Sequence, residues 1–486
     1  MTVVFISYLV LLIIIVAYSA RLSKTNEDFV LGGKKLSGYS LALSERATGE
    51  SAWLLLGLTG HAYAEGMASV WVAVGCVSGV LLIWFFMSGP IQRYTERTGA
   101  LTVPGLFIKR FPGNDRKISM VTSLIIIFFF MLYIASQFSG AGKIFNNTFG
   151  IDPFWGMVLG AGLVTVYTML GGFITVVATD AFQAILMVIT SVVLPIVALF
   201  VAMEHGVDLS GLTRSHGDMT GTGGAGLFSA VLIVNGLSWA FGYTGQPQLL
   251  TRLMALKNNR DVKIGRRVAV VWTMLAYGGA FMIGLVGYQL MKAGLLGDVS
   301  AGLAADTEKI MPTMVMVLLH PLLAGILLSG AVSAMMSTAS SQLMVASTAI
   351  SEDFIESYGK RRMTQRRKLL INKILILVVG AVAFFIGISL EETVYSLVSY
   401  AWSGIGAAFG PAVILLLFWK RFSLAGLFGS LAGGTLSTII WKTWFADPSG
   451  LSERLVSYLT AFALAVLLSL MFPDRDKQGI EIRDQG

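Results

Sequence analysis

The sequence contains very little cysteine and histidine, and it shows no motif of a catalytic site. Cys76 is the single cysteine among 486 residues, so neither a disulfide within the chain nor a cysteine metal cluster can form. The four histidines lack the spacing of metal ligands: His61, His205, His216 and His320. A P-loop and a nucleophile–base combination are also missing. These absences argue against an enzyme, a transition-metal site, a cofactor and an ATP-driven pump.

Charged residues are scarce as well. They make up 13% of the chain, against 55% hydrophobic residues, whereas soluble proteins average about 25% charged residues. The mean hydropathy is +0.75. Proline is rare (11 residues) and glycine abundant (54), and glycine allows membrane helices to pack closely or to break. The composition predicts an all-α integral membrane protein with the lipid bilayer as its solvent.

Apolar runs long enough to cross about 30 Å of hydrocarbon recur along the chain and predict about thirteen transmembrane helices. The expected spans are 3–20, 38–60, 66–90, 119–142, 153–170, 179–203, 226–247, 266–292, 312–347, 369–388, 394–419, 422–441 and 455–472. The first run could be read as a signal peptide, but it lacks a basic segment before it, which favours an uncleaved span. No long polar linker divides the chain, so residues 1–486 are expected to form one transmembrane unit.

Basic residues predict the orientation of these spans. Most of the 35 Lys and Arg residues lie in alternate connections and in the tail, and the connection after the seventh span includes Arg252, Lys257 and Arg260. Because basic residues gather in cytoplasmic loops, we expect the N-terminus outside and the C-terminus in the cytoplasm. The net charge of +8 is explained in the same way, because these basic residues determine topology and lie beside anionic lipid. No nucleic-acid partner is therefore expected.

The second expected span carries charges in its middle. Glu45, Arg46 and Glu50 stand within an apolar stretch, with Gly49 as a helix breaker. Charges at membrane depth are costly and mark functional sites. A broken helix explains them, since the apolar runs on either side are too short to span alone. The alternative is a misplaced span boundary with the charges at an interface. Glu45 and Arg46 could pair with each other or with separate partners.

The seventh expected span is irregular too. The segment 235–247 holds three glycines and a proline, which disfavours a continuous helix. Trp239 and Tyr243 are four residues apart, so they share a face wherever that segment is helical. They could be packing residues or part of a binding site. Two broken spans separated by five spans are the expected mark of a five-plus-five inverted repeat with binding sites at the breaks.

Two further segments offer oxygen ligands. Four hydroxyls lie close together in the ninth span, on Ser337, Thr338, Ser340 and Ser341. They could hold a monovalent cation together with freed backbone carbonyls, or they could bond back to their own helix. Asp180, at the start of the sixth span, could be a membrane-depth carboxylate or a helix cap.

Several motifs together resemble the sodium/solute symporter family, and most closely its bacterial sodium/proline branch. The similarity extends from the first span to about residue 440. It is carried by the segments Tyr167–Asp180 with Gln183, Gly242–Pro247, Met336–Gln342 and Ser399–Pro411. The resemblance implies a leucine-transporter-type core of two inverted five-helix repeats over 38–419. One extra span, 3–20, would precede this core, two spans in 420–472 would follow it, and 473–486 would be a cytoplasmic tail.

The resemblance also implies binding sites. A main sodium site between the second and ninth spans would use the carbonyls of Ala47, Glu50 and Ala334 with the hydroxyls of Ser337 and Thr338. A second sodium site would use Asp180, Ser337, Ser340 and Ser341. The substrate pocket would comprise Trp53, Tyr133, Trp239, Tyr243, Gln246 and Pro247.

One position departs from the proline branch. That branch has an aspartate where this chain has Gly49, and an acid follows one residue later as Glu50. Glu50 could replace the aspartate as the anionic group near the main sodium site, or it could contact an ammonium group of the solute.

The resemblance therefore implies a sodium-coupled secondary active symporter that imports a small organic solute, with proline or another small amino acid favoured. The other solutes considered are monocarboxylates, sugars and sialic acids. A passive channel and a non-transporting membrane sensor are the other classes. Na⁺ as coupling ion, the solute and lipid are the expected partners, in a bacterial inner membrane. The chain is expected to act as a monomer.

Overall fold

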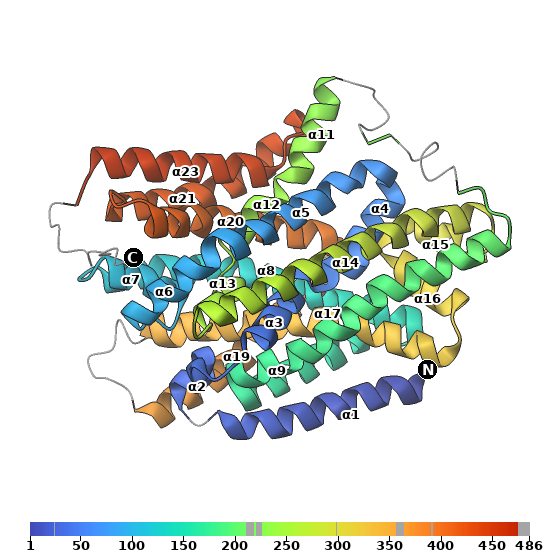
Figure 1. Cartoon of the computed structure of the whole chain (residues 1–486), viewed down its shortest axis with the longest axis horizontal. Coiled ribbons are helices and arrows are strands. Elements are labelled where there is room, and N and C mark those ends of the chain that lie inside the picture. The colour runs from blue at the N-terminus through green and yellow to red at the C-terminus, as the bar shows by residue number, and fades with distance from the viewer. Residues whose placement is uncertain are drawn as a thin grey trace.

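The structure is a computed structural model that describes residues 1–23, 25–209, 218–219, 226–297, 299–355, 364–389 and 392–474. Its described part is built from helices (Figure 1). The main ones are α1 (Thr2–Ser19), α2 (Asn26–Leu31), α3 (Gly38–Ala52), α4 (Thr59–Glu65), α5 (Val70–Leu82), α6 (Ser88–Thr98), α7 (Val103–Arg110), α8 (Asp115–Phe149), α9 (Pro153–Glu204), α11 (Leu227–Leu237), α12 (Trp239–Tyr243), α13 (Pro247–Met254), α14 (Asn259–Lys292), α15 (Ser300–Ala305), α16 (Ile310–Leu318), α17 (Pro321–Thr348), α19 (Gln365–Ser389), α20 (Val394–Phe418), α21 (Leu424–Ile440), α22 (Ala446–Ser449) and α23 (Glu453–Met471).

Ten helices of the described part are long and apolar enough to cross a membrane. Two of them, Gly38–Thr98 with 61 residues and Pro153–Glu204 with 52, are too long for one crossing, since about 20 residues span the hydrocarbon. A further apolar helix, Phe228–Tyr243, is shorter. The expectation of an all-α membrane protein is confirmed, while the number thirteen stays a prediction.

Glycines at positive φ divide the two long helices. Gly66 has φ +63° between α4 and the helical segment after it, and Gly172 has φ +63° inside α9. Only glycine adopts this region without strain. A connection over 171–178 was expected, but residues 173–178 are helical, so the interruption is one residue. This places Asp180 inside the second half of α9, where it cannot be a helix cap.

The ninth span begins later than expected. Residues 312–318 belong to α16, and a break at Leu319 and His320 separates this short helix from α17. Pro321 occupies the first position of α17, where its missing amide hydrogen costs nothing. The tail beyond residue 474 and the basic residues Lys360, Arg361 and Arg362 lie outside the described residues.

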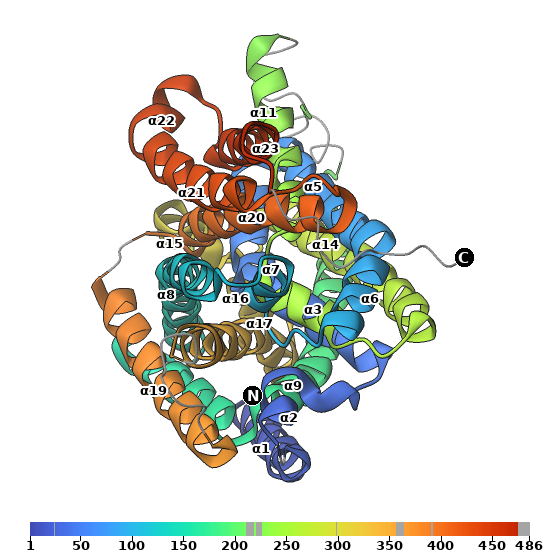
Figure 2. The same cartoon turned by 90° about the vertical axis from the view of Figure 1, so that its left-hand side faces the viewer.

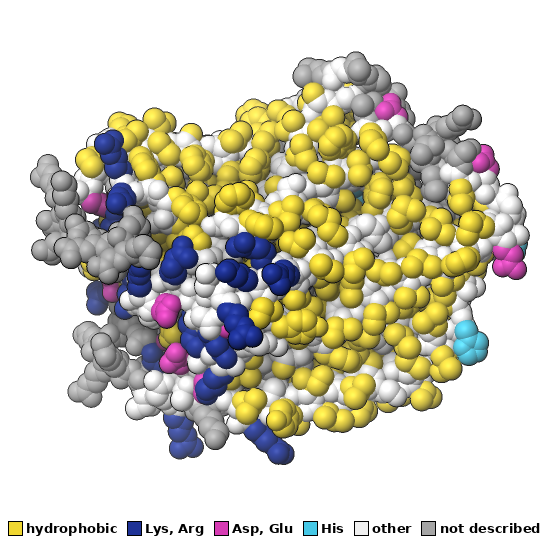
Figure 3. Space-filling model, viewed as in Figure 1, with side chains coloured by type: hydrophobic (Ala, Val, Ile, Leu, Met, Phe, Trp, Pro, Cys, Tyr) yellow, Lys and Arg dark blue, Asp and Glu magenta, His cyan; other side chains and the backbone are white. Residues whose placement is uncertain are grey.

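The helices are arranged around α3 and α17. Figure 2, viewed along the bundle, places these two helices near the centre. The helix α17 packs against α9, α8 and α3, and α14 packs against α9, α3 and α4. By contrast, α1 and α19 lie at the periphery and expose large apolar side chains such as Ile14 and Phe385. Figure 3 shows this apolar surface as a broad band, with Lys and Arg gathered at one end.

Helix α14 contains two adjacent glycines, of which one packs closely against α9 and the other does not. Replacing each by alanine therefore distinguishes the effect of close packing from the effect of helix propensity. A Cβ on Gly279 would meet the carbonyl oxygen of Ser191, in α9, at 1.9 Å, whereas a Cβ on Gly278 would meet nothing within 4 Å. Because Ser191 O is backbone, Gly279→Ala must push α14 and α9 apart, at a cost of about 1–3 kcal/mol. We expect Gly279→Ala to lower the thermal unfolding midpoint in detergent, and Gly278→Ala to leave it unchanged or raise it slightly. Equal midpoints for the two variants would contradict the close approach.

Candidate functional site

The break in the second span lies at Ser51, two residues after the expected breaker. Gly49 is helical, whereas Ser51 has φ 48° and ψ −172° and interrupts α3. Beyond it, residues Trp53–Leu58 form a π-helical turn that leads into α4. The amide of Ala52 donates to Gln137 Oε1 at 3.0 Å, which satisfies a buried backbone group that the break would otherwise leave without a partner. A non-glycine residue at positive φ is a strained position of the kind that collects at functional sites.

Four of the five residues expected at the main sodium site come together directly before this break. Ser337 Oγ, on α17, donates to Ala47 O at 3.0 Å and lies 3.2 Å from Ala334 O. Thr338 Oγ1 donates to Thr48 O at 2.9 Å. These side chains are fully buried. Neutral hydroxyl and carbonyl oxygens from two helices therefore converge at one level, which is the kind of donor set that a broken membrane helix offers to a sodium ion.

The fifth residue, Glu50, is present through its backbone. Its carbonyl belongs to the last turn of α3 and accepts the amide of Trp53 across the break. The sequence suggested two uses for the hydroxyls of α17, namely cation binding and hydrogen bonding within their own helix, and the hydroxyls differ in their contacts. Thr338 reaches α3, Ser340 donates to Ser337 O within its own helix at 3.0 Å, and Ser337 contacts both helices. The helix-bonding use is thus observed for Ser340 and partly for Ser337, while the cation use stays a prediction.

The residues expected at a second sodium site meet an arginine. Asp180 Oδ2 accepts from Ser44 Oγ at 2.6 Å and from Thr48 Oγ1 at 3.2 Å, and it lies 3.4 Å from Ser341 Oγ. Arg252 Nη2 donates to the same oxygen at 3.1 Å and also bonds to Ser341 Oγ. Asp180 Oδ1 is buried without a hydrogen-bond partner among the described residues, so one carboxylate oxygen remains as an acceptor.

Arg252 lies at the candidate site, although the sequence placed it in a connection between spans. It was counted among the basic residues of a cytoplasmic connection, but α13 carries it into the core, where it is 1% exposed. Its Nη1 donates to Gln248 O at 2.9 Å, and its guanidinium lies over the ring of Phe173, 5.1 Å from the centroid. The signal was available: Arg252 follows the broken segment 235–247 within two helical turns.

The three charges of the second span form one buried cluster. Arg46 is held by Glu45 through Nε at 2.6 Å and through Nη2, and its Nη1 lies 2.6 Å from Glu50 Oε1. All three side chains are fully buried, so the alternative of a misplaced boundary at an interface is wrong. The two carboxylates also have neutral partners on other helices. Trp84 Nε1 donates to Glu45 Oε2 at 2.9 Å, and the hydroxyls of Tyr277 and Tyr243 reach Glu50 Oε2.

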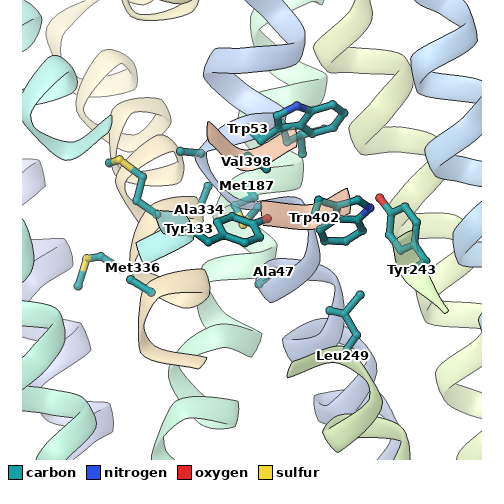
Figure 4. Close-up of a cluster of buried hydrophobic side chains, with 14 of the residues drawn as sticks. Ala47, Trp53, Tyr133, Met187, Tyr243, Leu249, Ala334, Met336, Val398 and Trp402 are labelled. Carbon is teal, nitrogen blue, oxygen red and sulfur yellow. The ribbon is translucent and has the colours of Figure 1, made fainter. Parts of the chain in front are cut away.

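The aromatic residues expected in the substrate pocket are all buried and mostly adjacent. The ring centroids of Trp53 and Trp239 lie 4.5 Å apart. Figure 4 shows Trp402, from α20, between Tyr133 and Tyr243, with centroid distances of 6.5 and 4.7 Å. The break between α12 and α13 therefore faces the break in α3.

The remaining two pocket residues line the break itself. Gln246 Nε2 donates to the carbonyl of Trp402 at 3.0 Å, and Pro247 opens α13. Trp402 and Tyr395, which stacks on Trp53 at 6.0 Å, belong to the same aromatic cluster and were not singled out from the sequence. Trp402 lay within the quoted segment Ser399–Pro411, but its spacing alone gave no reason to place it opposite Tyr243.

Comparisons with known proteins agree with this geometry. The sodium:solute symporter family is matched over residues 29–434. A sodium/proline symporter 2 of Staphylococcus saprophyticus is 33% identical over 463 residues, covering 93% of this chain and 88% of the relative. A sodium/proline symporter of Staphylococcus aureus is 32% identical over 471 residues, covering 95% and 90%. The chain belongs to the sodium:solute symporter family.

A solved structure shows the same fold. A Na⁺-coupled sialic acid symporter, in a substrate-bound outward-open state, superposes with a TM-score of 0.81 at 18% identity and covers 98% of this chain and 99% of its own. This match confirms the predicted leucine-transporter-type fold. The related proteins are transporters, which confirms that the chain is a symporter and not an enzyme.

The pairing of Arg252 with Asp180 leads to a stability prediction. Replacing Arg252 by Met leaves a buried carboxylate without its counter-charge, which costs about 3–5 kcal/mol. We expect Arg252→Met to lower the thermal unfolding midpoint in detergent strongly. Adding Asp180→Asn should recover much of the loss, because the unpaired charge is then gone. A double mutant whose loss equals the sum of the two single losses would show that the pair is not coupled.

Proposed function

We propose that this sodium symporter imports a small amino acid, with proline as the leading candidate. The observation that supports it most is the meeting of the α17 hydroxyls with the α3 carbonyls immediately before the Ser51 break, beside a pocket of aromatic residues. The family membership and the names of the two staphylococcal relatives favour the same solute. The sialic acid symporter shares the fold at low identity, and this carries no argument about the solute.

In the proposed cycle, Na⁺ binds the carbonyls of Ala47, Glu50 and Ala334 and the hydroxyls of Ser337 and Thr338. The hydroxyls that now donate to α3 carbonyls would turn their lone pairs to the ion. Sodium would then hold α17 and the break of α3 in one arrangement, and so complete the adjacent solute site. Trp53, Trp239 and Tyr243 would close over the solute; the close packing of the two indoles shows that these side chains can meet.

The sodium gradient is sufficient for uphill import. One sodium ion crossing about 150 mV releases roughly 3.5 kcal/mol, and a tenfold concentration gradient adds about 1.4 kcal/mol. A single ion could thus support accumulation of a neutral solute by several thousandfold. Asp180, Ser337, Ser340 and Ser341 remain the proposed second sodium site, but the ion would have to share Asp180 with Arg252 or replace it there.

Glu50 is proposed to act as an anion held beside the main site. Its carboxylate oxygens are engaged by Arg46, Tyr277 and Tyr243, while its carbonyl stays at the break. The carboxylate therefore cannot contact sodium in this arrangement without giving up a partner. It influences the ion through the charge it places on the last turn of α3, and it influences the solute through Tyr243.

The orientation is proposed from the basic end of the molecule. Figure 3 shows Lys and Arg gathered at the end of the molecule where α23 ends in Figure 1, and the N-terminus lies toward the opposite end. By the positive-inside rule, the basic end faces the cytoplasm. The N-terminus is then outside, and the chain, one transmembrane unit over 1–486, acts as a monomer in a bacterial inner membrane.

Uptake into proteoliposomes tests the solute. With an inward sodium gradient, labelled L-proline should accumulate above its external concentration, and replacing sodium by choline should abolish the accumulation. A panel of other labelled amino acids, pyruvate, glucose and N-acetylneuraminate serves as comparison. Sodium-driven uptake of one of these compounds without uptake of proline would reject proline and keep the symporter. Equal uptake in sodium and choline would reject coupling.

The sodium ligands can be tested with a matched control on the same helix. Removing the hydroxyls in Ser337→Ala and Thr338→Ala should raise the sodium concentration for half-maximal uptake about tenfold or more, since each removes a proposed ligand. Ser347→Ala should leave it unchanged, because the Ser347 hydroxyl donates within α17, to Met344 O. Glu50→Gln should weaken sodium binding by removing the nearby charge. Unaltered sodium affinity in Glu50→Gln would refute the electrostatic role of Glu50.

A further inference from the structure

One arginine outside the inverted-repeat core touches the aromatic cluster of the proposed solute site. Arg454 lies in the first turn of α23, and its side chain is 10% exposed. The guanidinium lies over the ring of Trp239, 4.4 Å from the centroid. Trp239 is in turn packed against Trp53, so a side chain of the C-terminal spans reaches the aromatic wall of the proposed solute site.

Arg454 is held in place mainly by neutral groups. Its Nε donates to Ser238 Oγ at 3.3 Å, and its Nη1 donates to Ser399 Oγ. The carboxylate of Glu453 lies 3.9 Å from Nη1, beyond hydrogen-bond distance, and its Oε1 accepts from Ser403 Oγ at 3.0 Å. The hydrogen bonds of the Arg454 side chain to described residues thus use Nε and Nη1, and none of them uses Nη2.

The opposite charge lies one helical turn further along α12. Tyr243 follows Trp239 by four residues, a rise of about 6 Å. Its hydroxyl contacts Glu50 Oε2 at 3.3 Å and Tyr277 at 2.6 Å. The Glu45–Arg46–Glu50 cluster holds two carboxylates and one guanidinium, so its formal charge is negative. The face of α12 therefore has a positive group at Trp239 and a negative cluster at Tyr243.

We infer that Arg454 binds the carboxylate of the solute, while the Tyr243 hydroxyl, tied to Glu50, lies at the amino end. This rests on the proposed function and narrows its solute to a compound with a carboxylate, best a zwitterion. A planar guanidinium with a free edge suits a carboxylate, and a simple sugar offers it no counter-charge. In the competing interpretation Arg454 has only a structural role, as a residue that links α23 to α20 and to α11–α12.

Ligand binding to the purified full-length chain in sodium chloride separates the two readings. The apparent Kd is measured from shifts of the thermal unfolding midpoint for L-proline and for L-prolinamide, which lacks the carboxylate charge. Pyruvate, N-acetylneuraminate and glucose complete the set. The variants are Arg454→Gln, Arg454→Lys, and, as control, Lys442→Gln, which removes an exposed charge near the end of α21.

We expect wild type to bind proline at least about tenfold more tightly than prolinamide, as a charge-assisted hydrogen bond would give. Arg454→Gln should bring that ratio close to one by weakening proline binding, and Arg454→Lys should give an intermediate ratio. Lys442→Gln should keep the wild-type ratio. If Arg454→Gln does not fold, the reduced ratio in Arg454→Lys carries the test.

Other outcomes overturn the inference. If Arg454→Gln weakens the binding of proline and of prolinamide equally, Arg454 has only a structural role. Binding of glucose alone, or of none of the carboxylates by wild type, would also overturn it. If pyruvate or N-acetylneuraminate binds in place of proline, and Arg454→Gln weakens that binding selectively, the carboxylate site stands while the proposed amino-acid solute fails.

Discussion

An ionised group in the interior of a membrane protein must be paired, because neither lipid nor apolar side chains can solvate it. Among the residues that the structure describes, two arginines are almost completely buried: Arg46 is part of α3, and Arg252 contacts it. Arg46 is clasped by Glu45 and Glu50, and Arg252 lies between Asp180, Ser341 and Ser44. The contacts of Arg252 join four helices, because Arg252 is on α13, Asp180 on α9, Ser341 on α17 and Ser44 on α3.

The pairing explains how α3 can be broken without losing its position. At Ser51 the helix gives up backbone hydrogen bonds, and Gln137 on α8 supplies one replacement. One residue earlier, the guanidinium of Arg46 and the hydroxyl of Tyr277 on α14 hold the Glu50 side chain. The break is thus flanked by strong contacts to neighbouring helices, so the carbonyls near it keep a defined direction. The proposed sodium site, which is made of neutral oxygens, would need that rigidity, since it would have no charged ligand of its own.

The two broken spans meet through the same network. Tyr243 on α12 contacts Glu50, and Trp239, one turn away, packs on Trp53 just past the Ser51 break. Movement of one break therefore changes the contacts of the other. This arrangement gives a physical route by which sodium at the proposed site between α3 and α17 would alter the aromatic cluster. In that proposal Glu50 takes the place of the aspartate that the proline branch has at the position of Gly49.

Much of the fold and part of the site follow from the sequence alone. Apolar runs of membrane length, the asymmetry of Lys and Arg, and glycines and charges inside two spans determine an all-helical membrane protein with two breaks, because burial in lipid imposes those patterns. The tertiary structure decided what no local pattern contains. It moved the break from Gly49 to Ser51, joined residues 173–178 to α9, and brought Arg252 into the core beside Asp180. It also placed Trp402 and Arg454 at the pocket. These outcomes depend on contacts between residues 50 to more than 200 positions apart. A buried charge finds its partner only when those distant helices pack, so no local sequence pattern shows which pairs will form.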